Sequence, residues 1–325
     1  MIGKQDVLDR AGEWQLRAEV VEKDYVLGWL LAAIARHPET SSHWVFKGGT
    51  SLKKCYFETY RFSEDLDFSL LEPARYSEED LGTILLEVTI EAASMSGLRF
   101  PRDAISVRSR RDKLGRPTFE GKVGYEGPLA YPGVRRILFD LTQHEPVLDG
   151  VHHQGVHHPY PDGLPEETRV PAYSLDELFA EKTRALFERS RPRDLYDVVY
   201  IQENRADTLN LPHARDLFQG KCRAKELAPP SAADLIAVVN GRRSRRTAGH
   251  ADCSGQSWTD LDGAWLRQCV AGRGGRPDQG SRARRSLASS SRASVRSSSG
   301  APAASRIEIA RRRSGSASWK RPWFS

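Results

Sequence analysis

The sequence predicts a mixed α/β fold over residues 1–240, and three observations carry this prediction. Two segments keep helical spacing of apolar side chains, near residues 15–36 and 77–97, and short segments with apolar residues at alternate positions lie among them. The expected strands are residues 44–47, 63–70, 104–109, 118–125 and 134–142. Two more helical patterns begin near residues 174 and 191 with no strand between them. A sheet with helices, followed by a helical region, is therefore expected.

Local signals support the starts of the expected helices. Ser77 and Asp80 form the pattern of a capping box, in which each residue satisfies a backbone amide of the other. Ser174 and Glu177 repeat this pattern at the start of a later helix. Pro192 suits the first turn of the helix after it, because that position needs no backbone donor. These signals indicate helices with defined beginnings.

The most informative stretch begins with a glycine turn. The apolar strand 44–47 ends at Gly48 and Gly49, and Thr50 opens an expected helix over 50–56. A glycine pair lets backbone amides come close to a polyphosphate, and the positive end of a helix favours an anion. This turn is therefore a candidate site for the phosphates of a nucleotide.

Two aspartates lie at alternate positions of the next expected strand. Leu66, Phe68 and Leu70 share one face of it, and Ser63, Asp65, Asp67 and Ser69 share the other. Asp65 and Asp67 are about 7 Å apart along the strand, so their carboxylates can converge on Mg²⁺. A half-buried edge strand with a wet acidic face would explain the acids alone. The preceding strand, glycine pair and helix make a nucleotidyl-transfer site the more specific interpretation.

Together these segments resemble the nucleotidyltransferase superfamily built on the DNA polymerase β core, and within it the AbiEii/AbiGii toxin family. The residues that carry the resemblance are Glu22, Lys23 and Asp24; Gly48, Gly49, Thr50 and Leu52; Ser63, Asp65 and Asp67; and Glu181, Lys182, Arg193, Asp194 and Asp197. The resemblance covers residues 15–205, with a slightly long gap between the glycines and the acids. It implies a polymerase β-type core with a mixed sheet. It also implies that an NTP binds at Gly48, Gly49, Thr50 and Ser63, and that Asp65 and Asp67 hold Mg²⁺.

A third carboxylate is expected from a later strand. Asp140 is the one acidic residue within the otherwise apolar part of the strand over 134–142. The resemblance implies that Asp140 joins Asp65 and Asp67 at the metal and helps to activate the attacking hydroxyl. A strand-end aspartate that accepts turn hydrogen bonds is the alternative interpretation.

The helical region supplies the remaining candidates. Lys182 lies on the apolar stripe of its helix, and a buried ammonium needs an anionic partner such as bound phosphates or the pair of Asp65 and Asp67. Alternatively, its stem packs while its head reaches water. Asp194 and Asp197 share one side of the next helix, where acids often only oppose the helix dipole. The resemblance implies catalytic roles for Lys182, Asp194 and Asp197, and leaves open which aspartate matters more. It also implies that Lys182 binds the nucleotide and steadies its phosphates or its base.

Two further groups have both a functional and a structural interpretation. The densest basic group consists of Arg108, Arg110, Arg111, Lys113 and Arg116. It would either contact the phosphates of an RNA or form a solvated hairpin tip. The histidine group consists of His152, His153, His157 and His158, in an expected loop over 149–171. These histidines have no acidic or cysteine partners at ligand spacing, which disfavours a metal site.

Charge is distributed unevenly along the chain. Residues 241–325 contain 17 Arg, one Lys and five acidic residues, a net charge of +13, whereas residues 1–240 carry −7. This tail is rich in Ser, Gly and Ala and has no sustained apolar period, so we expect it to be disordered. An Arg-rich arm for RNA and an end produced by a frameshift are the other interpretations. The abrupt change of composition favours disorder or a frameshift over the arm.

Several classes of protein are disfavoured. No apolar run is long enough to span a bilayer, and the N-terminus lacks the apolar core of a signal peptide, so a cytoplasmic location is expected. Cys55, Cys222, Cys253 and Cys269 show no paired spacing. A structural zinc site and a disulfide framework are therefore not expected.

These observations predict three parts and one main function. The parts are a nucleotidyltransferase core (1–170), a helical domain that closes the active site (171–240) and the tail (241–325). The resemblance implies a toxin of a bacterial abortive-infection or toxin–antitoxin system that transfers NMP from NTP to an RNA 3′ end, tRNA above all, with Mg²⁺ as cofactor. Its partner would be a cognate antitoxin. Transfer to a protein side chain and a non-catalytic GTP- or NTP-binding regulatory module are the alternatives; a glycosyltransferase is disfavoured by the glycine turn.

Overall fold

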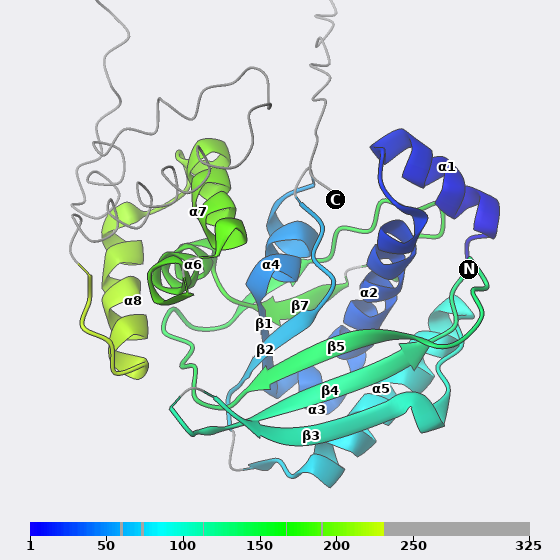
Figure 1. Cartoon of the computed structure of the whole chain (residues 1–325), viewed down its shortest axis with the longest axis horizontal. Coiled ribbons are helices and arrows are strands. Elements are labelled where there is room, and N and C mark those ends of the chain that lie inside the picture. Colours follow the sequence, from blue (N-terminus) through cyan, green and yellow to red (C-terminus); the bar gives the residue numbers. More distant parts are fainter. Residues whose placement is uncertain (59–60, 73–74, 113, 167, 190, 231–325) are drawn as a thin grey trace, which may run out of the picture. The chain divides into compact units, whose positions relative to one another are not determined.

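The strands of the protein form one mixed sheet. The computed structural model describes residues 1–58, 61–72, 75–112, 114–166, 168–189 and 191–230. Seven strands of that part of the chain pair in the order β3-β4-β5-β2-β1-β7-β6 (Figure 1). They are β1 (Trp44–Lys47), β2 (Leu66–Leu70), β3 (Ile105–Arg111), β4 (Pro117–Tyr125), β5 (Arg135–Thr142), β6 (His152–Gly155) and β7 (Arg169–Ala172). The expected disordered tail lies outside the described residues.

Helices precede, interrupt and follow this sheet. Before and within it lie α1 (Lys4–Trp14), α2 (Ala18–Arg36), α3 (Pro38–His43), α4 (Gly48–Ser51), the π-helical turn η1 (Leu52–Tyr56), α5 (Glu78–Ser96) and the short 3₁₀ turn η3 (Arg102–Ala104). After it come α6 (Leu175–Arg189), α7 (Pro192–Arg205) and α8 (Leu211–Ala224). Figure 1 shows these last three helices gathered together on the side of the sheet where α4 lies.

Strand direction brings three distant segments to one edge. β1 and β2 are antiparallel, so the end of β1 at Lys47 pairs with Asp67 near the start of β2. β2 and β5 are parallel, and Asp67 is the register partner of Asp140. Residues that follow β1 and begin β2 therefore lie beside Asp140, two residues before the end of β5.

The two faces of the sheet are covered differently. Phe46, Phe68 and Phe139 belong to a core that includes α2 and α5, and the Phe68 ring lies 5.2 Å from Phe46 and 6.3 Å from Phe139. The opposite face packs against α6 and α7 through a second core that contains Val45 of β1. On β5 that second face is exposed, and Asp140 lies on it. The covered part of this face thus gives way to an open part next to β2.

Most expected elements are present, with shifted ends. The capping box of Ser77 and Asp80 forms as predicted. At Ser174 only half of the expected box forms, because Glu177 Oε1 and Oε2 accept hydrogen bonds from the backbone amides of Leu148 and Asp149 instead. The expected loop over 149–171 is wrong, since β6 and most of β7 lie there and pair antiparallel. The helices α1 and α8 were not expected.

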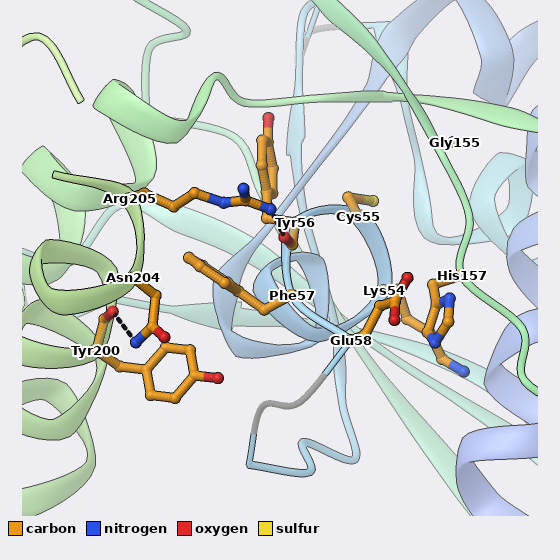
Figure 2. A pocket seen from close by; sticks show the side chains of 10 residues that line it. All are labelled: Lys54, Cys55, Tyr56, Phe57, Glu58, Gly155, His157, Tyr200, Asn204 and Arg205. Atoms are coloured by element: carbon orange, nitrogen blue, oxygen red, sulfur yellow. Dashed lines mark hydrogen bonds between the residues drawn. The ribbon is translucent and has the colours of Figure 1, made fainter. Parts of the chain in front are cut away.

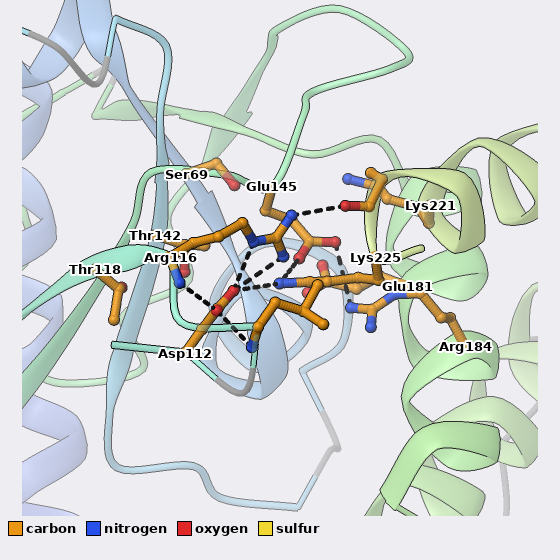
Figure 3. A network of polar contacts seen from close by, with 12 residues as sticks. Ser69, Asp112, Arg116, Thr118, Thr142, Glu145, Glu181, Arg184, Lys221 and Lys225 are labelled. Carbon is orange, nitrogen blue, oxygen red and sulfur yellow. Dashed lines mark hydrogen bonds and ion pairs between the residues drawn. The ribbon is translucent and has the colours of Figure 1, made fainter. Parts of the chain in front are cut away.

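A chain of charged side chains joins the β3–β4 hairpin to the helical region (Figure 3). Arg116 pairs with Asp112 at 2.9 Å and also donates to the backbone oxygen of Ala224 in α8. Lys225 lies 3.1 Å from Glu145, whose other oxygen lies 3.2 Å from Arg184 of α6. Arg116, one member of the basic hairpin group, therefore has a structural role, since it links the hairpin to α8.

Replacing Lys221 with methionine is expected to lower the free energy of unfolding by about 3 kcal/mol, because it leaves a buried carboxylate without its cation. The Nζ of Lys221 lies 2.7 Å from Oε1 of Glu177, and neither side chain is exposed. Burial lowers the pKa of Lys221, although the neighbouring carboxylates oppose this. Urea unfolding measures the effect. The control is Arg36→Met, which breaks an exposed pair with Glu91 and should cost at most about 1 kcal/mol; equal losses would refute this account.

Candidate active site

The candidate site begins with a left-handed turn at the end of β1. Gly48 has a φ of +81°, a conformation that residues with a Cβ rarely adopt. A Cβ built there would lie 2.1 Å from Oδ2 of Asp67. The backbone of the turn at Gly48 is thus in direct contact with the carboxylate of Asp67, and a residue with a side chain would not fit at position 48.

The loop before β2 folds back onto the same turn. A Cβ at Gly49 would lie 3.0 Å from both the Nη2 of Arg61 and the Oγ of Ser63. The hydroxyl of Thr50 donates to the backbone oxygen of Asp65 at 2.5 Å. The structure therefore brings together the predicted nucleotide-binding residues Gly48, Gly49, Thr50 and Ser63 with the loop that carries Asp65.

The three predicted metal ligands lie in or next to β2 and β5. Asp67 lies in β2, Asp65 lies one residue before that strand, and Asp140 is the partner of Asp67 on β5. Burial, and then the charge of Asp140, raise the pKa of Asp67 to about 6. Burial also raises the pKa of Asp65. The hydroxyl of Thr142 donates to Oδ1 of Asp140 at 3.3 Å. This is a long bond between side chains of β5, and not the turn hydrogen bond of the alternative interpretation.

The character of these groups fits a divalent cation. Carboxylate oxygens are the ligands that Mg²⁺ prefers, and the pKa of Asp67 is raised first by burial and then by the charge of Asp140. Among the described residues, no three histidine, cysteine or acidic side chains are gathered closely enough to form a metal site. Magnesium binding by Asp65, Asp67 and Asp140 therefore stays a prediction.

Two buried aspartates of α7 hold cations next to the turn. Asp197 accepts two hydrogen bonds from Arg61, at 2.7 and 2.8 Å, and its Oδ2 lies 3.0 Å from the Nζ of Lys182. Asp194 accepts two bonds from Arg189, both at 2.9 Å. Neither aspartate side chain is exposed. Lys182 is also buried, so it does not reach water through its stem but ends at a carboxylate.

The family model described as the nucleotidyl transferase AbiEii toxin of a type IV toxin–antitoxin system matches residues 29–250, more than half of the chain. The chain belongs to the AbiEii nucleotidyltransferase toxin family. The predicted resemblance is thus confirmed, and the family implies a nucleotide substrate and an antitoxin partner. No curated protein sequence is significantly similar to the chain.

A solved structure supports the fold of this AbiEii-family toxin. The structure of this chain is similar to that of MenT4, a nucleotidyltransferase toxin from Mycobacterium tuberculosis H37Rv, with a TM-score of 0.50 and 21% sequence identity. The likeness covers 83% of this chain and 89% of the MenT4 chain. The predicted mixed α/β nucleotidyltransferase fold is confirmed by this comparison.

Sequence reasoning missed three cations of the site: Lys47, Arg61 and Arg189. Lys47 is 5% exposed, and its Nζ lies 3.9 Å from Oε1 of Glu181. Its pKa is raised by Glu181 and three other carboxylates, against the effect of burial. The position of Lys47, directly before the glycine pair and on the same face as Val45, could have indicated it. Arg61 and Arg189 gave no local signal, because their partners lie in α7.

The other groups considered from the sequence lie away from the turn. In the basic hairpin group, Arg110 pairs with Glu120 at 2.8 Å and Arg111 donates to the backbone oxygen of Gly115. His158 is packed among aromatic rings, 4.8 Å from that of Tyr160, and burial lowers its pKa to about 3. Within the residues described, no helix has the length and apolar character needed to cross a membrane.

A separate cavity of about 490 Å³ lies beside the last residues of η1 (Figure 2). Its lining includes Phe57, His157, Tyr200 and Arg205, and none of the predicted site residues. The thiol of Cys55 also borders it, and burial raises the pKa of that thiol to about 12. Cys55 is therefore protonated at neutral pH and is a poor nucleophile.

Proposed function

We propose that this toxin transfers a nucleoside monophosphate from an NTP to the 3′ hydroxyl of an RNA in the presence of Mg²⁺, with tRNA as the acceptor. One observation carries the proposal: the glycine turn of Gly48 touches Asp67, and Asp67 is paired in register with Asp140. A nucleotide bound at this turn would have its phosphates beside the carboxylates. Membership of the AbiEii family supports nucleotidyl transfer as the reaction class.

Each group has a role in this proposal. The backbone at Gly48, Gly49 and Thr50, with the hydroxyl of Ser63, would hold the triphosphate. Asp65, Asp67 and Asp140 would hold Mg²⁺, which when bound would neutralise charge that develops on the phosphates. Asp140 lies on the exposed part of the sheet face, so an acceptor strand can approach it.

The reaction exchanges one bond for another. The 3′ oxygen of the acceptor forms a bond to the α-phosphorus. At the same time the bond breaks between that phosphorus and the oxygen that links it to the β-phosphate. Pyrophosphate leaves, and the proton of the attacking hydroxyl passes to a carboxylate, for which Asp140 is the candidate. The product is an RNA with an added nucleotide, and modification of the tRNA acceptor end would stop aminoacylation and hence translation.

Labelling with radioactive nucleotides tests this function. The full-length protein is incubated with total RNA, Mg²⁺ and each of the four α-³²P-labelled NTPs, in parallel with Asp65→Ala. The proposal expects label in the tRNA band with one or more NTPs, loss of that label in Asp65→Ala, and no label on RNA whose 3′ diol has been oxidised with periodate.

Other outcomes of that experiment separate the alternatives. Asp65-dependent label on a protein band would select transfer to a protein side chain. Metal-dependent NTP binding without release of pyrophosphate would select the regulatory module. Absence of any Asp65-dependent label on RNA or protein would overturn the assignment of an active transferase.

A further inference from the structure

We propose that Asp194 and Asp197 do not touch the substrate but hold Arg61, Lys182 and Arg189 as a binding site for the triphosphate. This inference deepens the proposed function and rests on it for the identity of the ligand. It assigns two arginines to the site and gives the two aspartates of α7 a positioning role.

The first unit of this site is Asp197 with two cations. Arg61 binds Asp197 in a bidentate geometry, with Nε donating to Oδ1 and Nη2 donating to Oδ2. The Nζ of Lys182 lies 3.0 Å from the same Oδ2. These three residues come from the loop before β2, from α6 and from α7, so the carboxylate of Asp197 ties three segments together. Because its side chain is not exposed, Asp197 fixes both cations without competition from water.

The second unit repeats this geometry one turn earlier on α7. Asp194 lies three residues before Asp197, and Arg189 binds it through Nε and Nη2 in the same bidentate way. Side chains three apart on a helix point to the same side. The two aspartates therefore present their cations to one side of α7.

That side faces the glycine turn and the carboxylates. The Nη2 of Arg61 lies where a Cβ at Gly49 would be crowded, at 3.0 Å. The Nζ of Lys182 lies 3.0 Å from the same Oδ2 of Asp197 that accepts from the Nη2 of Arg61, so these two cations are neighbours. The pKa of Arg189 is raised chiefly by its bond to Asp194, and the charge of Asp67 contributes. All three cations are thus within electrostatic reach of the turn or of Asp67.

The charges of this group suit a polyphosphate. Three cations and two aspartates leave a net charge of +1, next to acids that would themselves repel a phosphate. Each arginine uses its Nε and Nη2 on an aspartate, which orients the guanidinium, and the Nη1 of Arg61 also donates to the backbone oxygen of Phe62 at 3.5 Å. The arginine side chains keep 22% and 37% of their surface exposed, so a ligand can reach them. An oriented, partly exposed pair of guanidinium groups is typical of phosphate recognition.

Binding of inorganic tripolyphosphate, measured by calorimetry with the full chain, tests this site without turnover. We expect Arg61→Gln and Arg189→Gln each to raise the Kd about tenfold, as loss of one charge-assisted contact does. Arg61→Lys should recover part of the loss. The control Arg36→Gln removes an exposed arginine on α2 and should leave the Kd unchanged.

Double-mutant cycles test the positioning role. If Asp197 acts through Arg61 and Lys182, adding Asp197→Asn to a variant that already lacks both cations should change the Kd little, whereas adding it to Arg189→Gln should give a nearly multiplicative loss. The pair of Asp194 and Arg189 should behave in the same way. In transfer assays the single variants should raise the KM for NTP more than they lower kcat. A structural role alone would not produce this pattern.

The results separate this inference from the proposed function. Arg61-dependent binding of tripolyphosphate by a protein that labels no RNA would refute the function and keep the triphosphate site. Unchanged Kd values for Arg61→Gln and Arg189→Gln would overturn the inference even if the protein transfers nucleotides. If Asp197→Asn fails to fold by circular dichroism, the arginine variants, which leave the buried helix carboxylates in place, decide the question.

Discussion

Replacing Asp67 with asparagine is expected to abolish nucleotide transfer and, at the same time, to raise the melting temperature of the ligand-free protein. The carboxylate of Asp67 lies against Gly48 of the glycine turn. Its loss should lower the rate of transfer by about 10³-fold, as does removal of a group that stabilises charge in the transition state. The same carboxylate is held near Asp140 in a partly buried place, and this raises its pKa to about 6. The ionised carboxylate of Asp67 therefore destabilises the ligand-free protein.

The sign of the stability change follows from the direction of the pKa shift. A carboxyl group with a folded-state pKa above its ordinary 3.8 binds a proton more tightly in the folded protein than in the unfolded chain. Ionised Asp67 thus lowers stability at pH 7, and this penalty is relieved as the pH falls from about 6 to below 4. The penalty should be about 1–2 kcal/mol, less than the full shift implies, because Asp67 is only half-buried.

Differential scanning fluorimetry at several pH values measures this effect. Asp67→Asn should melt about 2–6 °C above the wild type at pH 7. The difference should shrink toward pH 4, where the wild-type carboxyl is itself protonated. The control Asp103→Asn changes an exposed aspartate of η3 and should alter neither activity nor melting temperature. A lower melting temperature for Asp67→Asn, or retained transfer activity, would contradict this interpretation.

Replacing Gly48 with alanine is expected to damage both the fold and the site. Alanine would adopt the left-handed conformation with strain, and its Cβ would lie 2.1 Å from Oδ2 of Asp67 unless that carboxylate moved away. We expect a loss of stability of roughly 2–3 kcal/mol, from backbone strain together with overpacking. Transfer should fall by about 10²–10³-fold, because a displaced carboxylate no longer meets the ligand.

Gly133 supplies a matched control for the strain. Its φ is +89°, and a Cβ there would meet no atom within 4 Å. Gly133→Ala should therefore cost only the conformational strain, about 1–2 kcal/mol, and keep full activity. Urea unfolding and transfer rates of the two variants separate strain from contact. Equal losses of activity in both, or an active Gly48→Ala, would refute the contact as a requirement.

The parts of the site that sequence reasoning could predict are those with a local pattern. Gly48, Gly49 and the alternation of Asp65 with Asp67 are readable because a turn and a strand constrain neighbouring residues. Asp140 was predicted as a lone acid in an apolar strand, and the parallel register with β2 places it beside Asp67. Lys182 was found on an apolar helical stripe, where its burial required a partner.

The parts that could not be predicted depend on contacts between distant segments. The partner of Lys182 is Asp197, and that of Arg61 lies 136 residues away in sequence, so neither pair follows from spacing. The strand β6 has the sequence His-His-Gln-Gly, without the β-branched and aromatic side chains that indicate strands. The strand β7 has four residues, of which Val170 alone is β-branched and the next is a proline. Their pairing comes from the tertiary structure.

The positions of the bound metal and nucleotide show whether the glycine turn and the carboxylates form one site. Crystals of the wild-type protein soaked with Mn²⁺ and a non-hydrolysable NTP analogue would show both by anomalous scattering and difference density. We expect the manganese peak between the carboxylates of Asp67 and Asp140, with the triphosphate against residues 48–50. Nucleotide bound elsewhere, such as in the cavity that Phe57 and Arg205 line, with no metal at Asp67, would contradict it.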